Sequence, residues 1–167
     1  MAIPRCPIGE GASSHGPGDL TMTDTVDREK RSEIMSRVGS RDTKPELVVR
    51  RIAHGLGFRY RLHRKDLPGC PDIVFPRYRS VIFVHGCFWH RHPSCKYASS
   101  PKTRVEYWEN KFRGNVARDA RNETLLRNLG WRVMVIWECE TTNHKAVAER
   151  ISSYLRQGRC PLEGLEG

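Results

Sequence analysis

The sequence predicts one α/β domain with a mixed β-sheet, and three observations lead to this prediction. Its segments alternate between helical and strand patterns in the order α-α-β-β-β-α-β-α, which is typical of a sheet with helices packed on it. The 167 residues suffice for one compact core. No internal repeat divides the chain, and we expect no second domain.

Two helices are expected before the first strand. The segment "VDREKRSEIMSRVG", residues 26–39, is highly charged and closes on a glycine, which commonly ends a helix. The segment "TKPELVVRRIAHGLG", residues 43–57, opens with Thr43 and Glu46 at capping-box spacing, and its glycines can end it.

Three strands and a long helix follow. The segment "FRYRLH", residues 58–63, alternates in polarity as a half-buried strand does. The short apolar runs at 72–75 and 80–85 are separated by "PRYR", which predicts a hairpin. Residues 103–130 are mostly helical in pattern, with Gly114 as the point of a possible interruption.

The last two elements are a strand and a helix. "WRVMVIWE", residues 131–138, is the strongest strand pattern, and residues 144–158 read as an amphipathic helix. Residues 1–24 are rich in Gly, Pro, Ser and Thr, which predicts a disordered extension. We therefore expect a folded domain at 25–157 and a flexible tail at 158–167.

The composition favours a polyanionic partner. Lys and Arg number 29 against 19 Asp and Glu, and the formal charge of +10 points to nucleic acid, with a merely solvated basic surface as the alternative. No secretory leader or apolar run of membrane-spanning length is visible, so a cytoplasmic location and no membrane partner are expected. Six cysteines in a reducing compartment suggest metal binding or free thiols.

The stretch "HGCFWHRHPSC" gathers ligand-type side chains directly after the strand at 80–85. Thiolate and imidazole groups together favour tetrahedral Zn²⁺. The end of the strand at 131–138 supplies a fourth ligand if it lies beside the end of the earlier strand. The predicted zinc set is Cys87, His92, Cys95 and Cys139. The alternative is that Cys139 is a buried thiol; in either case His85 and His90 are left for other work.

An acidic position opens the predicted hairpin. In "LPGCPDIVF", Asp72 stands at a strand start, and His85 ends the next strand. A Pro-Asp of this kind, followed by acid-x-Lys on the second strand, is the signature of the PD-(D/E)xK nucleases, in which carboxylates hold Mg²⁺. This chain has Phe83, Val84 and His85 in place of acid-x-Lys. One carboxylate with a backbone carbonyl and waters can still hold Mg²⁺, and a histidine can transfer protons.

In these motifs the chain resembles the very short patch repair (Vsr) endonuclease family, which nicks DNA beside a thymine mispaired with guanine. The resemblance runs from residue 26 to residue 154 and rests on "RSEIMSRVGSRDTKPE", "LPGCPDIVF", "SVIFVHGCFWH", "NVARDARNETLLRNLGWRV" and "VIWECE". It implies a restriction-endonuclease-like fold, a mixed sheet flanked by helices, with catalytic Mg²⁺ and structural Zn²⁺.

The resemblance also implies roles for individual residues. Asp72 and the carbonyl of Val84 would bind Mg²⁺. His90, supported by Glu46, would activate the attacking water, and His85 would act at the scissile phosphate. The resemblance places Asp119 in the acidic site and makes zinc ligands of the four residues named above. The aromatics that would wedge into DNA beside the mismatch are Phe88, Trp89 and Trp108.

Purely structural roles stay open as alternatives for some of these residues. Glu46 can serve as the capping residue of its helix, and Asp119 can be a surface charge paired with a neighbouring arginine. Trp108 on a helix is ordinarily a core residue. The loop is one residue longer before Cys95 than the family form, so the assignment of His92 as the zinc ligand stays open.

The resulting expectation is a monomeric, Mg²⁺-dependent endonuclease that nicks double-stranded DNA at a T:G mismatch, with mismatch-repair proteins as possible partners. One rival is a nuclease of the same fold that acts on other DNA, for example in phage defence. The other rival is a catalytically inactive, zinc-containing DNA-binding module. Nicking assays on matched and mismatched duplexes separate the three.

Overall fold

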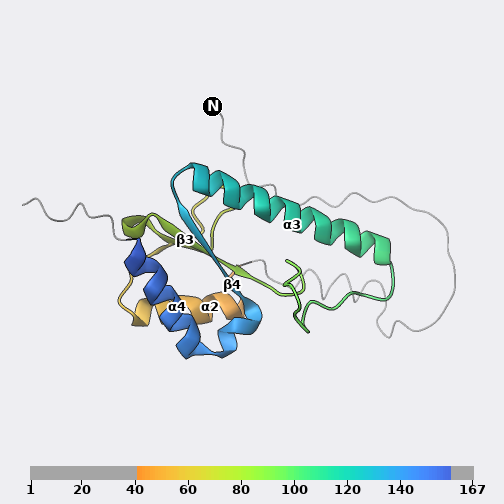
Figure 1. Ribbon diagram of the computed structural model, residues 1–167, viewed down its shortest axis with the longest axis horizontal. Helices are drawn as coiled ribbons and strands as arrows, with labels where there is room; N and C mark the ends of the chain where they lie inside the picture. The colour runs from red at the N-terminus through yellow and green to blue at the C-terminus, as the bar shows by residue number, and fades with distance from the viewer. Residues whose placement is uncertain (1–40, 159–167) are drawn as a thin grey trace, which may run out of the picture.

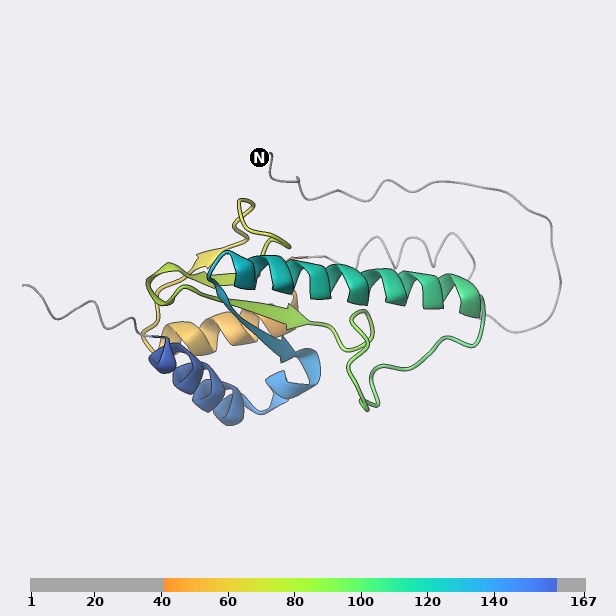
Figure 2. The same ribbon diagram turned by 45° about the horizontal axis from the view of Figure 1, so that its top comes forward.

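The computed structural model describes residues 41–158, and Figure 1 shows their arrangement. The expected helix at 26–39 and the two expected tails lie outside the described residues, apart from position 158. Within the described range a four-stranded sheet separates one long helix from a pair of shorter ones (Figures 1 and 2).

The sheet has the order β1-β2-β3-β4 and is mixed. β1 pairs antiparallel with β2 and β2 antiparallel with β3, whereas β3 and β4 run parallel. The strands are β1 (Arg61–Leu62), β2 (Ile73–Phe75), β3 (Ser80–His85) and β4 (Arg132–Trp137). The predicted hairpin is confirmed as β2 and β3, joined through the 3₁₀ turn η1 (Pro76–Tyr78).

Helices cover both faces of the sheet, which explains why its inner strands are apolar on both sides. α2 (Lys44–Gly55) and α4 (His144–Gln157) lie on one face, and α3 (Val105–Asn128) lies on the other (Figure 2). A second 3₁₀ segment, η2 (Glu138–Thr142), connects β4 to α4.

The two cores follow the alternation of side chains along the strands. Ile73, Phe75 and Ile82 face α2 and α4, where they join Val49 and Ile151. Val74 and Val81 point the other way and pack against Leu126 of α3. A register slip of one residue would exchange these two sets, so both faces fix the pairing.

The structure departs from the sequence prediction at two elements. The expected strand at 58–63 shrinks to the two exposed residues of β1, because Phe58 and Tyr60 turn into the core and His63 has a positive φ of 45°. The long helix is not interrupted at Gly114, where an added Cβ would meet no atom within 4 Å. A glycine in open space lowers helix propensity without breaking the helix.

The predicted capping box at the start of α2 is present, with Thr43 as N-cap and Glu46 as its third residue. α2 ends at Gly55, and the chain then turns at Gly57, whose φ of +82° suits glycine. No helix among residues 41–158 has the length and apolar character that a membrane crossing requires.

Replacement of Ile136 by alanine tests the core. Ile136 is fully buried near the end of β4, so the substitution is expected to lower the free energy of unfolding by about 2–5 kcal/mol. Urea unfolding of the full chain measures it. Leu125→Ala, on the exposed side of α3, is the control and should change stability by less than about 0.5 kcal/mol. Equal losses for the two variants would contradict this assignment of the core.

Candidate active site and metal centre

The candidate site lies where the parallel strands β3 and β4 end together. Their pairing sets His85 beside Trp137. The chain leaves β3 into the loop 86–104 and leaves β4 into η2, so this loop and Cys139 meet at one edge of the sheet. The predicted site residues come from α2 (Glu46), from β3 and the residue before β2 (Asp72, Val84, His85), from the loop (Cys87, Phe88, Trp89, His90, His92, Cys95), from α3 (Trp108, Asp119) and from η2 (Cys139).

Asp72 is held against the backbone of the neighbouring strand. The β2–β3 register sets its carboxylate beside the amide of Val84, which donates to Oδ2 at 2.8 Å. Burial raises the pKa of Asp72 to about 6, and the carboxylate of Glu46 adds to this rise. Oδ1 has no hydrogen bond to another described residue. A half-buried carboxylate with one oxygen that accepts no hydrogen bond from a described residue, and with a raised pKa, suits a divalent cation as its partner.

His85 and His90 form a stacked pair beside an aspartate. Their ring centroids are 4.0 Å apart with planes 10° from parallel. Nδ1 of His90 lies 2.5 Å from Oδ2 of Asp119, which α3 supplies from 29 residues further along the chain. If Nδ1 donates to this carboxylate, Nε2 is left as a proton acceptor. Burial, and next the neighbouring His90, lower the pKa of His85 to about 4, which favours its neutral form.

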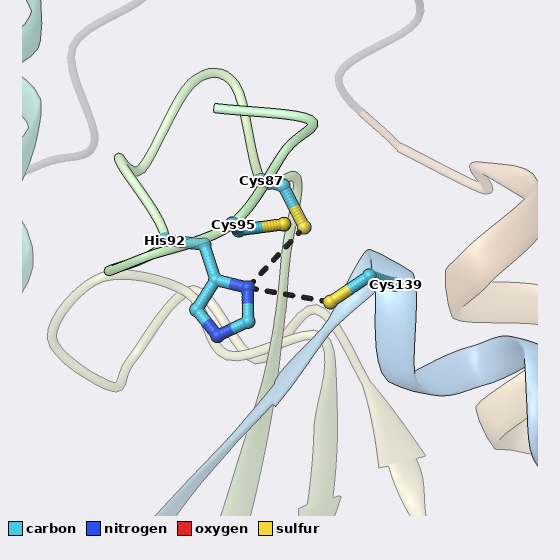
Figure 3. A group of neighbouring side chains, drawn as sticks. All are labelled: Cys87, His92, Cys95 and Cys139. Carbon is cyan, nitrogen blue, oxygen red and sulfur yellow. Dashed lines mark hydrogen bonds between the residues drawn. The ribbon is translucent and has the colours of Figure 1, made fainter. Parts of the chain in front are cut away.

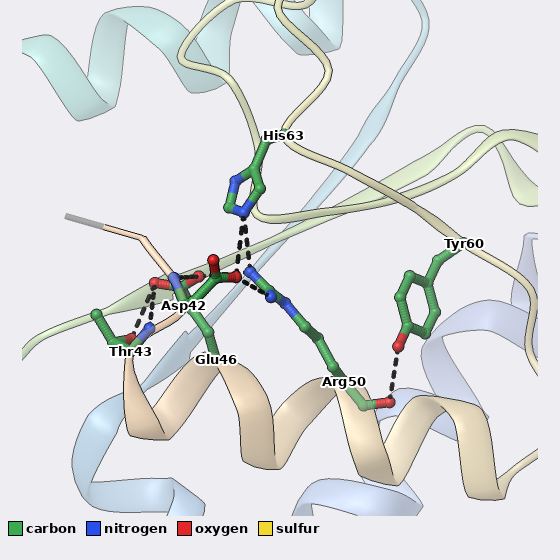
Figure 4. A network of polar contacts seen from close by, with 6 residues as sticks. All are labelled: Asp42, Thr43, Glu46, Arg50, Tyr60 and His63. Atoms are coloured by element: carbon green, nitrogen blue, oxygen red, sulfur yellow. Dashed lines mark hydrogen bonds and ion pairs between the residues drawn. The ribbon is translucent and has the colours of Figure 1, made fainter. Parts of the chain in front are cut away.

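Both carboxylate oxygens of Glu46 accept hydrogen bonds at the start of its own helix, and its expected support of His90 stays a prediction. Oε1 accepts from the hydroxyl of Thr43 at 2.9 Å and from its amide at 3.4 Å (Figure 4). Oε2 accepts from the amide of Asp42 at 3.0 Å and from Nη2 of Arg50 at 2.6 Å. These four donors fill the acceptor positions of one carboxylate. No described hydrogen bond joins Glu46 to His90; Glu46 acts on the site through its charge, which Asp72 senses.

Arg50 is a buried residue that the sequence analysis missed. Its side chain is 8% exposed and its guanidinium binds Glu46, Asp42 and Nε2 of His63, the last at 3.0 Å (Figure 4). Ligand atoms of Asp42, Glu46 and His63 lie within 4.8 Å of one another, close enough to share a metal ion. The guanidinium of Arg50 already contacts all three residues. The spacing of Glu46 and Arg50, four residues apart on a helix, is the signal that would have found this pair.

The four predicted zinc ligands come together in Figure 3. One ligand atom from each of Cys87, His92, Cys95 and Cys139 lies within 4.8 Å of all the others. Nδ1 of His92 is 3.3 Å from the sulfur of Cys139 and 3.6 Å from that of Cys87. Burial raises the pKa of Cys87 to about 12, so its thiolate requires a cation.

Three thiols and one imidazole at this spacing fit tetrahedral Zn²⁺. His92 lies with the cysteines and His90 with Asp119, which is the arrangement preferred from the sequence despite the longer loop.

The three candidate wedge residues form one aromatic group on α3. Phe88 makes edge contacts with Trp89 and Trp108 at centroid distances of 5.1 and 5.6 Å. Phe112, one helical turn after Trp108, joins them and was not anticipated. All three candidate wedge residues are half-buried, so the group is neither a closed core nor a free surface.

Polar and basic contacts tie this aromatic group to its surroundings. Nδ2 of Asn115 donates to the carbonyl of Trp89 at 3.1 Å. Lys111 lies 5.8 Å from the Trp89 ring, and the guanidinium of Arg91 lies 4.5 Å from the Phe112 ring. Cations over the rings of a partly buried aromatic group suit a surface that meets DNA.

Several known endonucleases are similar to this chain in sequence. A family model described as DNA mismatch endonuclease Vsr matches residues 23–96. The type II nicking enzyme V.XorIIP of Xanthomonas oryzae pv. oryzae is 50% identical over 134 residues, which cover 80% of this chain and 98% of that protein. V.NmeAIP of Neisseria meningitidis, also a type II nicking enzyme, is 43% identical over 81% of this chain and 96% of its own length. The DNA mismatch endonuclease Vsr of Escherichia coli is 40% identical over 80% of this chain and 88% of its own.

Among solved structures, the catalytic domain of the homing endonuclease I-Bth0305I aligns with a TM-score of 0.49 at 19% identity. The alignment covers 71% of this chain and 100% of that domain.

The two histidines of the loop are expected to separate in a metal analysis. His92→Ala should lower the zinc content and the melting temperature, because a tetrahedral site loses one of four ligands. His90→Ala should keep zinc and stability, since its partner is Asp119. Atomic absorption and thermal melting of the two purified variants measure this. Zinc loss in His90→Ala with retention in His92→Ala would reverse the assignment.

Proposed function

This chain belongs to the Vsr family of DNA endonucleases, and we propose that it nicks one strand of duplex DNA beside the thymine of a T:G mispair in a Mg²⁺-dependent reaction. The observation that carries the proposal is the convergence of Asp72, His85, His90 and Asp119 near the start of β2 and the end of β3. We also propose that the mixed sheet and its flanking helices are a restriction-endonuclease-like fold.

The hydrolysis would rest on a division of labour among these side chains. Mg²⁺, when bound by Asp72 and the carbonyl of Val84, would polarise the phosphodiester and lower the pKa of a water. His90 would take the proton of the attacking water at Nε2 while Asp119 holds Nδ1. His85, neutral and packed on His90, would donate one N–H to the scissile phosphate. One such site per chain makes a nick and needs no second subunit, so a monomer is proposed.

Zinc would have a structural role in this scheme. A site with four protein ligands leaves no open position for substrate. It would tie the loop that carries His90 to the first residues after β4 through Cys139. Fixing the loop holds the general base and the neighbouring aromatics at defined positions on the sheet edge.

The aromatic group would supply mismatch selection. Apolar side chains that enter a base step unstack and kink the duplex, which costs a few kcal/mol. A T:G wobble pair is cheaper to deform than a Watson–Crick pair, so Phe88, Trp89 and Trp108 would favour it. The excess of basic residues would add affinity for phosphates independent of sequence. The site of action would be DNA in the bacterial cytoplasm, with recruitment of mismatch-repair proteins as a further proposal.

Asp72→Asn is expected to abolish nicking and leave DNA binding intact, because the neutral amide no longer supplies the charged ligand for Mg²⁺. Nicking of a labelled T:G duplex and its binding by gel shift measure the two properties. Asp66→Asn is the control, since Asp66 is an exposed acid paired with Arg64. Activity of Asp72→Asn within a few-fold of the wild type would remove this residue from the mechanism.

Trp89→Ala is expected to weaken binding to the T:G duplex by about 1–3 kcal/mol and to leave the matched T:A duplex almost unchanged, because the lost stacking acts only on the deformed site. Binding to both duplexes and zinc content are measured together. Tyr97→Ala, an exposed aromatic of the same loop, is the control. A variant that keeps its zinc and its full T:G preference would show that Trp89 merely packs in the loop. Equal nicking of matched DNA by the wild type would favour the rival with other DNA as substrate.

A further inference from the structure

One aromatic side chain at the site has no role in the proposed reaction. Trp137, the last residue of β4, stands between the zinc cluster and the catalytic histidines. Its ring lies 4.2 Å from that of His92, with planes 12° from parallel. It also makes a T-shaped contact with His85, in which the ring centroids are 5.4 Å apart and the ring planes form an angle of 73°.

These contacts form a continuous series of rings across the site. His92 stacks on Trp137, Trp137 meets His85, and His85 stacks on His90. We refer to these four residues as the ring series. One of its ends is a zinc-ligand candidate, 3.3 Å from the sulfur of Cys139. The other end is the candidate general base, 2.5 Å from Asp119.

Packing of the hydrophobic core does not account for Trp137. Trp131, at the other end of β4, packs on the core between the sheet and α3. Trp137 joins neither core cluster of residues 41–158 and is only half-buried. Its backbone amide is held by the carboxylate of Glu140 at 2.7 Å, which fixes the point where β4 ends. A large aromatic side chain placed here, outside the core, contacts functional side chains on both sides.

We propose that Trp137 is a positioning residue that couples the zinc centre to the catalytic histidine pair. A metal-ligating histidine is usually oriented by a second contact, commonly a hydrogen bond on its other ring nitrogen. Here the flat indole face would perform that task for His92. Its edge would restrict the plane of His85, and stacking would pass this restriction on to His90. A small displacement of a general base costs much rate, since proton transfer requires near-ideal geometry.

This inference rests on the proposed function for its kinetic part only. The structural part states that occupancy of the metal centre changes the surroundings of His85 through Trp137, whatever DNA the enzyme cleaves. The two parts therefore call for separate measurements on the full-length protein.

The structural part is tested by NMR of the histidine rings. Zinc is added to metal-free wild-type protein, and the imidazole signals of His85 and His90 are followed together with those of His92. All three are expected to move. In Trp137→Met, which fills space without a ring, the response of His85 and His90 should fall by at least about half while His92 still responds. Trp131→Met is the matched control and should keep the wild-type response.

The kinetic part uses the same zinc-loaded proteins on the T:G duplex. Trp137→Met should lower kcat by about 10- to 100-fold, with KM nearly unchanged, because only the placement of reacting groups is altered. Trp137→Phe retains a ring and should recover most of the loss. Zinc content and melting temperature are measured on every sample.

Several outcomes would overturn the proposal. If the His85 signal of the wild-type protein does not change when zinc is added, the proposal is wrong. This measurement needs no variant, so it decides the question even if Trp137→Met fails to fold. An unchanged His85 response in a zinc-bound Trp137→Met protein would also overturn the proposal, as would a Phe variant as impaired as the Met variant. An enzyme that does not prefer T:G but shows the Trp137-dependent response would refute the proposed function and leave the coupling in place.

Discussion

The parallel pairing of β3 with β4 is the constraint on which the site depends. It sets the ends of two strands side by side, although His85 and Trp137 are 52 positions apart in the sequence and α3 lies between them. The loop after β3 and the turn after β4 then start from the same edge of the sheet. Cys139 can reach the loop cysteines only because of this pairing, and Trp137 stands beside His85 for the same reason.

Charge balance is the second determinant of the site. Asp72 and Glu46 are close enough to sense each other, and burial raises the pKa of Asp72 to about 6. Arg50 binds Glu46 at 2.6 Å, whereas no ion pair joins Asp72 to another described residue. Two carboxylates shielded from water would destabilise the fold without cations. The protein compensates one with an internal guanidinium and leaves the other in a position suited to a metal ion.

α3 joins the aromatic group to the histidine pair. One stripe of this helix carries Trp108, Phe112, Asn115 and Asp119, spaced four, three and four residues apart. The first two pack on the loop aromatics, Asn115 holds the carbonyl of Trp89, and Asp119 holds the ring of His90. Contacts on successive residues of the loop therefore come from one rigid element. A displacement of the aromatics on DNA would act on the same helix that orients His90.

The sequence by itself determined the elements and the types of ligand. Short apolar runs predict β2, β3 and β4, and a capping box marks the start of α2, because these signals are local. Cysteines and histidines clustered after an apolar strand indicate a zinc-type site by their chemistry alone. The tertiary structure decided which side chains meet. Asp119 pairs with His90, which is 29 residues away in the sequence. The carboxylate of Glu46 accepts hydrogen bonds from the start of its own helix and from Arg50. Trp137 meets His85 across a parallel strand pair. Such pairings depend on register and helix rotation, and these are fixed only when the two faces of the sheet are packed.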